Sequence, residues 1–376
     1  MEQEDYRKLI SGQSRGIGAM LLRFLLYIAS IFYQLVVCLR NFLYSSGWLK
    51  IHHANAIVIS VGNITVGGTG KTPLVIWMCK FLQQKNIPVA ILTRGYKTQA
   101  KGRGTKDEGR ETRIDEPGIL TESCPQAKII VNPDRVAGAN EAVNKFGIKV
   151  LIMDDGFQHR RLGRDLDIVT IDGTRPFGYD KLLPAGLLRE PVDSLKRADA
   201  IIITRSNQVS ESELNKIEEK IQKIKSNIVI TRSIHSPVCA RTTDNKEISI
   251  EQLKGKKIFA FCGIGNPDAF IETIKGLGVN LVGVKIYDDH YHYADKDMDD
   301  IRTKAKELKA ELVLTTQKDW SKLSIENRKS KAKLVAAKID IPFAYLVVEI
   351  KFPDGENKLK QLIEGTLSGK IAILQK

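Results

Sequence analysis

A glycine-rich loop between an apolar strand and an apolar helix constrains this chain more than any other feature. The loop reads Val-Gly-Gly-Thr-Gly-Lys-Thr over residues 66–72 and follows a β-rich run at 56–61. A helix is predicted over 73–85, with Pro73 in its first turn, where a missing N–H costs little. Glycines let backbone N–H groups converge on phosphate oxygens, and the helix N-terminus adds a favourable dipole. The order strand, loop, helix therefore predicts a phosphate-binding site.

We expect this loop to bind a nucleoside triphosphate. Lys71 would contact the β- and γ-phosphates, and the Thr72 hydroxyl would hold Mg²⁺. The strict sequence pattern has a glycine five residues before Gly70, where this chain has Thr65. A glycine turn without a ligand is the alternative, and the placement between strand and helix favours nucleotide binding over it. The predicted nucleotide-binding residues are Val66, Gly67, Gly68, Thr69, Gly70, Lys71 and Thr72.

Two adjacent carboxylates, Asp154 and Asp155, follow a buried strand predicted over 150–153. The carboxyl end of such a strand is where a nucleotide-binding sheet places its magnesium carboxylate. Adjacent side chains on a strand point to opposite faces, so we expect the two acids to differ in role. The alternative is a solvated strand end without a ligand.

Transfer of a phosphoryl group to an alcohol also needs a group that accepts the hydroxyl proton. Asp115 is a candidate, although spacing alone does not choose it over Glu116. His290 can approach from the second half of the chain, but a satisfied structural role is the ordinary expectation for a single histidine.

Short continuous apolar runs alternate with helical stretches along the chain, which predicts an α/β fold with a parallel sheet. We expect two α/β domains with a cleft between them, the first P-loop NTPase-like and preceded by a membrane-associated helix. The polar segment 99–113 is predicted to be a mobile surface loop. The expected divisions are a hydrophobic helix at 1–50, a nucleotide-binding domain at 51–226, a β-like bridge at 227–250 and a second α/β domain at 251–376.

The N-terminal segment carries an uncharged run from Phe24 to Leu39, bounded by Arg23 and Arg40. A full membrane span needs roughly 20 apolar residues, so this run is short. No small-residue cleavage site follows it, which argues against a signal peptide. A buried core helix is the alternative. We favour a helix that lies in the membrane interface or inserts shallowly, with the basic domain docked on an anionic leaflet.

The composition and motifs of the chain indicate which classes of partner it can bind. Its 58 Lys+Arg against 44 Asp+Glu leave a net charge of +14, which suits a polyanionic neighbour. No nucleic-acid module is recognised, and an Asn/Thr-Lys-x-Asp guanine reader is absent, because the similar residues at 316–319 have the wrong spacing. Five cysteines without a CxxC pair favour a reducing cytoplasm over a zinc ribbon or a disulfide framework.

Several stretches together resemble one family, the tetraacyldisaccharide 4'-kinases of lipid A biosynthesis. The most specific is Asp-Asp-Gly-Phe-Gln-His-Arg-Arg-Leu at 154–162, and it is accompanied by similar stretches at 60–73, 182–191, 262–267, 289–290 and 318–319. The resemblance implies a kinase on the cytoplasmic face of the inner membrane. It would transfer the γ-phosphoryl group of ATP to the 4'-hydroxyl of a tetraacylated glucosamine disaccharide 1-phosphate, giving lipid IVA.

The resemblance also implies roles for single residues. Asp115 would accept the proton while paired with His290, although Ile114 replaces a usual glycine and Tyr291 a common second histidine. ATP and Mg²⁺ are the implied cofactors, with Lys71 catalytic. We expect a monomer whose partners are the acylated disaccharide and an anionic inner-membrane surface, and no nucleic acid. The expected magnesium or active-site positions are Thr72, Asp154, Asp155 and Glu190, with Arg189 and His159 near the phosphates.

Overall fold

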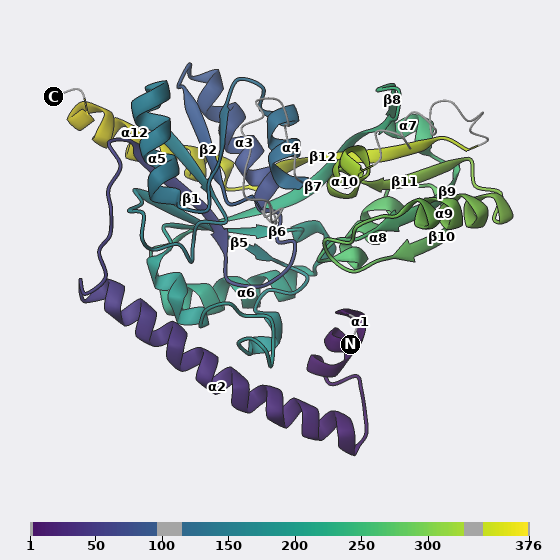
Figure 1. Ribbon diagram of the computed structural model, residues 1–376, viewed down its shortest axis with the longest axis horizontal. Helices are drawn as coiled ribbons and strands as arrows, with labels where there is room; N and C mark the ends of the chain where they lie inside the picture. The colour runs from purple at the N-terminus through teal and green to yellow at the C-terminus, as the bar shows by residue number, and fades with distance from the viewer. Residues whose placement is uncertain (1–2, 96–114, 327–340, 375–376) are drawn as a thin grey trace, which may run out of the picture. The chain divides into compact units, whose positions relative to one another are not determined.

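The computed structural model describes residues 3–95, 115–326 and 341–374 (Figure 1). The chain divides into two compact units. The first comprises 1–94, 126–235 and 350–376, and the second comprises 95–125 and 236–349. The domain ranges expected from the sequence, each of which is one continuous segment, remain a prediction. The predicted mobile loop at 99–113 lies outside the described residues.

The first unit is built on a parallel sheet with the strand order β6-β5-β1-β4-β2-β3. Most of its strands are buried on both faces, which is why they are short continuous apolar runs. Val61 of β1 is in register with Asp154, the last residue of β4, and Asn63, the last residue of β1, is in register with Thr170 of β5. The carboxyl ends of these three parallel strands therefore lie at one edge. The strands are β1 (Ile57–Asn63), β2 (Val89–Thr93), β3 (Lys128–Val131), β4 (Val150–Asp154), β5 (Leu166–Asp172) and β6 (Ala200–Thr204).

Helices follow these strands, and side-chain caps mark where two of them begin. Ser210 and Glu213 form a capping box at the start of α6, and Asp134 caps α5. The helix α3 begins at Lys71, so the last two residues of the glycine-rich loop form the start of this helix. Apart from the N-terminal helices, the described helices and short 3₁₀ turns of this unit are α3 (Lys71–Gln84), α5 (Arg135–Phe146), η1 (Gly178–Asp180), η2 (Val192–Arg197), η3 (Ser206–Gln208), α6 (Glu211–Ile224) and α12 (Glu356–Leu374).

The second unit has its own parallel strands in the order β10-β9-β11-β12 and its own apolar core. Its helix α10 packs against α4. Two strands, β7 (Val229–Thr242) and β12 (Phe343–Asp354), each begin in one unit and end in the other. The remaining elements are α4 (Asp115–Ser123), β8 (Glu247–Ser249), α7 (Ile250–Leu253), β9 (Lys257–Cys262), α8 (Pro267–Lys275), β10 (Asn280–Ile286), α9 (Asp295–Glu307), β11 (Leu312–Thr316) and α10 (Gln317–Glu326). The predicted α/β class with a largely parallel sheet is confirmed.

The N-terminal segment forms α1 (Gln3–Ile10) and α2 (Ile17–Ser45). Within the described part of the chain, α2 is the helix long and apolar enough to cross a membrane. It extends the apolar run of the sequence at both ends. Only Ser30 and Val37 of α2 are buried, whereas Phe32 is 66 % exposed. The alternative of a buried core helix is therefore wrong.

Candidate active site

The glycine-rich loop at 66–72, here called the phosphate loop, joins β1 to α3 at the carboxyl edge of the sheet. Gly67 and Gly70 have φ values of 116° and 84°, in the region that favours glycine. A Cβ on Gly70 would lie 2.7 Å from Nε2 of His235, so only glycine fits there. Burial, with Arg205 nearby, lowers the pKa of His235 to about 3. The His235 imidazole that packs against the loop is therefore neutral at pH 7.

The carbonyl groups of the phosphate loop are held by side chains from neighbouring strand ends. Arg205 donates from Nη2 to the Gly68 carbonyl at 2.8 Å, and the Thr204 hydroxyl donates to the Thr69 carbonyl at 3.0 Å. Arg205 in turn pairs with Asp172 at 2.5 Å, and both side chains are buried. Because these carbonyls are engaged, the loop conformation is fixed before any ligand arrives. Polar residues at the ends of β5 and β6 were the only sequence signal for this support.

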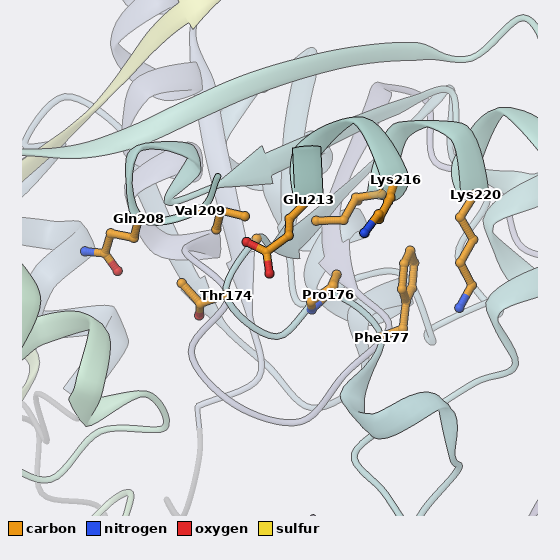
Figure 2. Close-up of a pocket in the computed structure, with 10 residues that line it drawn as sticks. Thr174, Pro176, Phe177, Gln208, Val209, Glu213, Lys216 and Lys220 are labelled. Carbon is orange, nitrogen blue, oxygen red and sulfur yellow. The ribbon is translucent and has the colours of Figure 1, made fainter. Parts of the chain in front are cut away.

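A cavity of about 480 Å³ lies beside this support (Figure 2). It is lined from the segment after β5, from η3 and from α6, and its side chains are a mixture of apolar, neutral polar, basic and acidic groups. Thr174, on its wall, donates its hydroxyl to Asp172 at 2.8 Å. The ammonium of Lys220 lies 4.1 Å from the centre of the Phe177 ring. The wall of the cavity is thus hydrogen-bonded to Asp172, one member of the Arg205–Asp172 pair that supports the phosphate loop.

The lysine of the loop points at the carboxylate that follows β4. Lys71 Nζ lies 3.3 Å from Asp155 Oδ1, and Arg189 Nη1 donates to both Asp155 oxygens at 2.9 Å. Burial would raise the pKa of Asp155, but Lys71 and Arg189 outweigh it and hold that pKa well below its usual range. Asp155 is therefore an anion that keeps two cations beside the phosphate loop.

The neighbouring acid, Asp154, is buried at the end of β4, while the side chain of Asp155 is 39 % exposed. The two acids differ in exposure where the strand ends, because Asp155 lies just beyond β4 with a φ of 52° and no longer follows the side-chain alternation of the strand. Arg135 donates to the Asp154 carbonyl at 3.3 Å. Among the residues that the structure describes, no three His, Cys, Asp or Glu side chains gather into a metal-binding cluster. A divalent cation here would need Thr72, these acids and ligand oxygens together.

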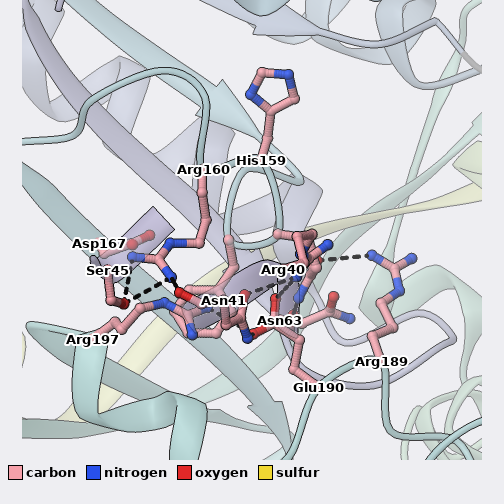
Figure 3. A network of polar contacts seen from close by, with 12 residues as sticks. Arg40, Asn41, Ser45, Asn63, His159, Arg160, Asp167, Arg189, Glu190 and Arg197 are labelled. Carbon is pink, nitrogen blue, oxygen red and sulfur yellow. Dashed lines mark hydrogen bonds and ion pairs between the residues drawn. The ribbon is translucent and has the colours of Figure 1, made fainter. Parts of the chain in front are cut away.

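Glu190, an expected magnesium position, lies in a different network (Figure 3). Its side chain is fully buried and accepts hydrogen bonds from Arg40 at 2.8 Å, Arg197 at 2.9 Å and Asn41 at 3.0 Å. Burial would raise the pKa of Glu190, but Arg197 and Arg40 keep it below its usual range. Both oxygens are occupied by protein donors, so the contacts of Glu190 do not fit direct magnesium binding.

The most specific stretch of the sequence, 154–162, also reaches α2. Arg160 donates to the Asn41 carbonyl at 2.7 Å, and Gln158 donates to the Asn63 carbonyl at 2.8 Å. A Cβ on Gly62 would lie 2.5 Å from that of Phe157, so β1 and this stretch approach closely. In Figure 3 His159 points away from the Glu190 network. The 154–162 stretch therefore contacts α2 directly, through the hydrogen bond of Arg160.

In the second unit, His290 follows β10 with a φ of 61°. Lys318 Nζ lies 3.3 Å from His290 Nε2 and 3.5 Å from Asp289 Oδ1. Lys318 belongs to the first turn of α10, which packs against α4. The helix α4 begins at Asp115, although the side chains of Asp115 and Glu116 lie outside the described part of the chain. The His290 loop and α4, the helix that starts at Asp115, thus both contact α10.

Comparisons with known proteins cover most of the chain. The family model for tetraacyldisaccharide-1-P 4'-kinase matches residues 22–368. The tetraacyldisaccharide 4'-kinase of Halothermothrix orenii is 35% identical over 85% of this chain and 88% of its own. That of Chlorobaculum parvum is 34% identical over 93% of this chain and 96% of its own. The crystal structure of LpxK from Aquifex aeolicus in complex with ATP is 31% identical, with a TM-score of 0.67 over 92% of this chain and 99% of that one.

Proposed function

Because this chain belongs to the tetraacyldisaccharide-1-P 4'-kinase family, we propose that it transfers the γ-phosphoryl group of ATP to the 4'-hydroxyl of a tetraacylated glucosamine disaccharide 1-phosphate. The chain is thus an alcohol-acceptor phosphotransferase of lipid A biosynthesis, and the product is lipid IVA. The observation that carries the assignment is the phosphate loop with Lys71 beside Asp155, in a chain that matches the family over nearly its whole length.

ATP binds at the phosphate loop in this proposal, with Val66, Gly67, Gly68, Thr69, Gly70, Lys71 and Thr72 around its phosphates. The transition state of phosphoryl transfer spreads charge over the equatorial oxygens, so positioned cations provide most of the catalysis. Lys71 neutralises that charge, and Arg189 is the second cation at the same place. In the structure both cations form ion pairs with Asp155, and these ion pairs place them beside the phosphate loop.

Magnesium fits the oxygen donors at this edge of the sheet. The Thr72 hydroxyl is in the first turn of α3, Asp154 is the last residue of β4, and Asp155 follows it directly. Hard oxygen donors of this kind, together with phosphate oxygens, suit Mg²⁺. When bound, the ion neutralises charge on the β- and γ-phosphates. We assign its protein ligands to Thr72, Asp154 and Asp155. Both Asp155 oxygens now meet Arg189, but that side chain is 39 % exposed, so incoming phosphates can take over its cations. Glu190 is left out because its carboxylate is fully buried among three protein donors.

The proton of the acceptor hydroxyl goes to Asp115, with His290 orienting that carboxylate. The support for this assignment is that α4, which begins at Asp115, packs on the same helix whose Lys318 contacts His290. A carboxylate oriented by a second group is a common form of general base. Glu116 is the alternative base one position along the helix.

The helix α2 docks the enzyme on the cytoplasmic leaflet of the inner membrane. One side of it is bonded to the protein, and large apolar side chains on the rest of it are exposed. Exposed apolar area of this kind is unfavourable in water, and the net charge of +14 favours an anionic lipid surface. An acylated substrate stays in that leaflet. The exposed side chains of α2 include Met20, Leu21, Phe24, Phe32, Leu35, Val36, Leu39 and Phe42, and Trp48 just after the helix is also exposed.

A thin-layer assay tests the proposed function. The purified protein is incubated with the lipid A precursor, Mg²⁺ and γ-³²P-ATP, with γ-³²P-GTP as the control nucleotide. We expect a labelled lipid with ATP and much less with GTP. Label that appears only as inorganic phosphate would refute the assignment to this acceptor.

A further inference from the structure

We propose that Arg40 and Asn41 of α2 are positioning residues for phosphoryl transfer, because they hold Glu190 and thereby place Arg189 against Asp155. The proposal rests on the proposed kinase function and adds a second role for α2 beside membrane docking. Glu190 is then the link between the helix and the site. The network is drawn in Figure 3.

The first step is the environment of Glu190. Its carboxylate is fully buried and meets two guanidinium groups and one amide. Leaving a buried carboxylate without its partners is strongly unfavourable. The position of Glu190 therefore depends on the positions of Arg40 and Asn41. These two donors are adjacent residues near the C-terminal end of α2.

The second step is the backbone of the next residue, Arg189. Its N–H donates to the Ile64 carbonyl, just before the phosphate loop, at 2.7 Å. Its carbonyl accepts from the hydroxyl of Tyr33, on α2, at 2.9 Å. Its side chain then reaches both oxygens of Asp155. Arg189 is therefore fixed on one side by α2 and on the other by the phosphate loop's strand.

The third step is the segment that carries Asp155. Arg197, which also binds Glu190, lies 4.4 Å from the centre of the Phe157 ring. Arg160 donates to the Asn41 carbonyl and lies 3.3 Å from the Ser45 hydroxyl. Both sides of the Asp155–Arg189 pair are thus tied to residues 40–45 of α2. A shift of this end of α2 would move the carboxylate and the arginine together.

The experiment measures kinase activity in detergent micelles, where membrane docking does not limit the rate. The variants are Arg40→Met, Glu190→Gln, the double variant and Tyr33→Phe. Lys196→Met is the matched control, since Lys196 lies in the same turn as Arg197 but is 64 % exposed and pairs only with Asp193 among the contacts described. For each protein, kcat, the KM for ATP, the Mg²⁺ concentration at half-maximal rate and Tm are measured.

We expect Arg40→Met and Glu190→Gln each to lower kcat by about tenfold or more, with the KM for ATP within about threefold of the wild type. The double variant should be no slower than the slower single variant, because both changes break one link. The Mg²⁺ dependence should be unchanged, and Lys196→Met should match the wild type. Tyr33→Phe removes one hydroxyl and should lower kcat about two- to fivefold with an unchanged Tm.

Three results would overturn the proposal. Full micelle activity in Arg40→Met would show that α2 does not position the site. A shift of the Mg²⁺ midpoint in Glu190→Gln that is absent in Arg40→Met would make Glu190 a metal ligand. If Arg40→Met does not fold, Tyr33→Phe decides, and wild-type kcat in that variant contradicts the inference. A wild-type protein that does not phosphorylate the disaccharide would instead refute the proposed function itself.

Discussion

Asp155 lies between two cations, with its Oδ1 3.3 Å from Lys71 Nζ and 2.9 Å from Arg189 Nη1. Lys71 is in the first turn of α3, Asp155 directly follows β4, and Arg189 lies in the segment before η2. They form the charged centre of the proposed site. The following predictions depend on this centre and on the elements that support it.

The Asp155 carboxylate should stay ionised through the whole working pH range of the enzyme. Lys71 and Arg189 lower its folded-state pKa, so its contribution to stability is complete above the unfolded value of about 4 and is lost as the pH falls through the folded-state pKa. The difference in urea midpoint between the wild type and Asp155→Asn should therefore be constant from pH 8 to pH 5. A difference that shrinks between pH 7 and pH 5 would contradict the lowered pKa.

Arg205→Met should weaken ATP binding. The substitution removes the donor to the Gly68 carbonyl and leaves Asp172 buried without its guanidinium. Loss of one partner of a buried pair typically costs about 3–5 kcal/mol, part of which falls on the loop conformation. We expect a KM for ATP raised about tenfold. The matched control is Arg175→Met, and an unchanged KM in Arg205→Met would show that the loop keeps its conformation without this support.

The general base can be identified by two paired substitutions. Asp115→Asn should lower kcat by about 10²–10⁴-fold, because a positioned base contributes that much, while the KM for ATP changes little. Glu116→Gln should remain near the wild-type rate. Steady-state kinetics of both variants decide the matter, and the reverse pattern would assign the base to Glu116.

Membrane docking should depend on the exposed apolar side chains of α2. Replacing Phe32 and Leu35 by Ser removes apolar area that is 66 % and 60 % exposed. At about 25 cal/mol per Å² of apolar area, the lost burial should weaken binding to anionic vesicles by at least about tenfold. Vesicle co-sedimentation measures this, with neutral vesicles as the control. Unchanged binding would place the docking surface elsewhere.

Much of the fold follows from local patterns. The apolar runs predicted at 56–61 and 150–153 correspond to β1 and β4, because strands buried on both faces leave a continuous signal. The glycine-rich loop was likewise recognisable from its neighbours. The predicted roles of Asp115, His290, Lys71, Thr72, Asp154 and Asp155 stay predictions.

The support of the site could not be predicted in the same way. Arg40 and Glu190 are 150 positions apart, and Arg205 and Asp172 are 33 apart. Such pairs leave no periodicity or spacing in the sequence, because only the packed sheet brings them together. Glu190 shows the consequence, since its type and place suggest a metal ligand while its burial and donors make it a partner of α2.

The central claim is that a triphosphate bound at the phosphate loop gives its γ-phosphoryl group to the lipid's 4'-hydroxyl with Lys71 stabilising the transfer. The most direct measurement compares the wild type with Lys71→Met in label transfer from γ-³²P-ATP, with the product position determined by ³¹P NMR. The account predicts a new phosphate monoester at the 4' position and a rate at least about a hundredfold lower in the variant. Wild-type transfer by Lys71→Met, or phosphate at any other position, would contradict it.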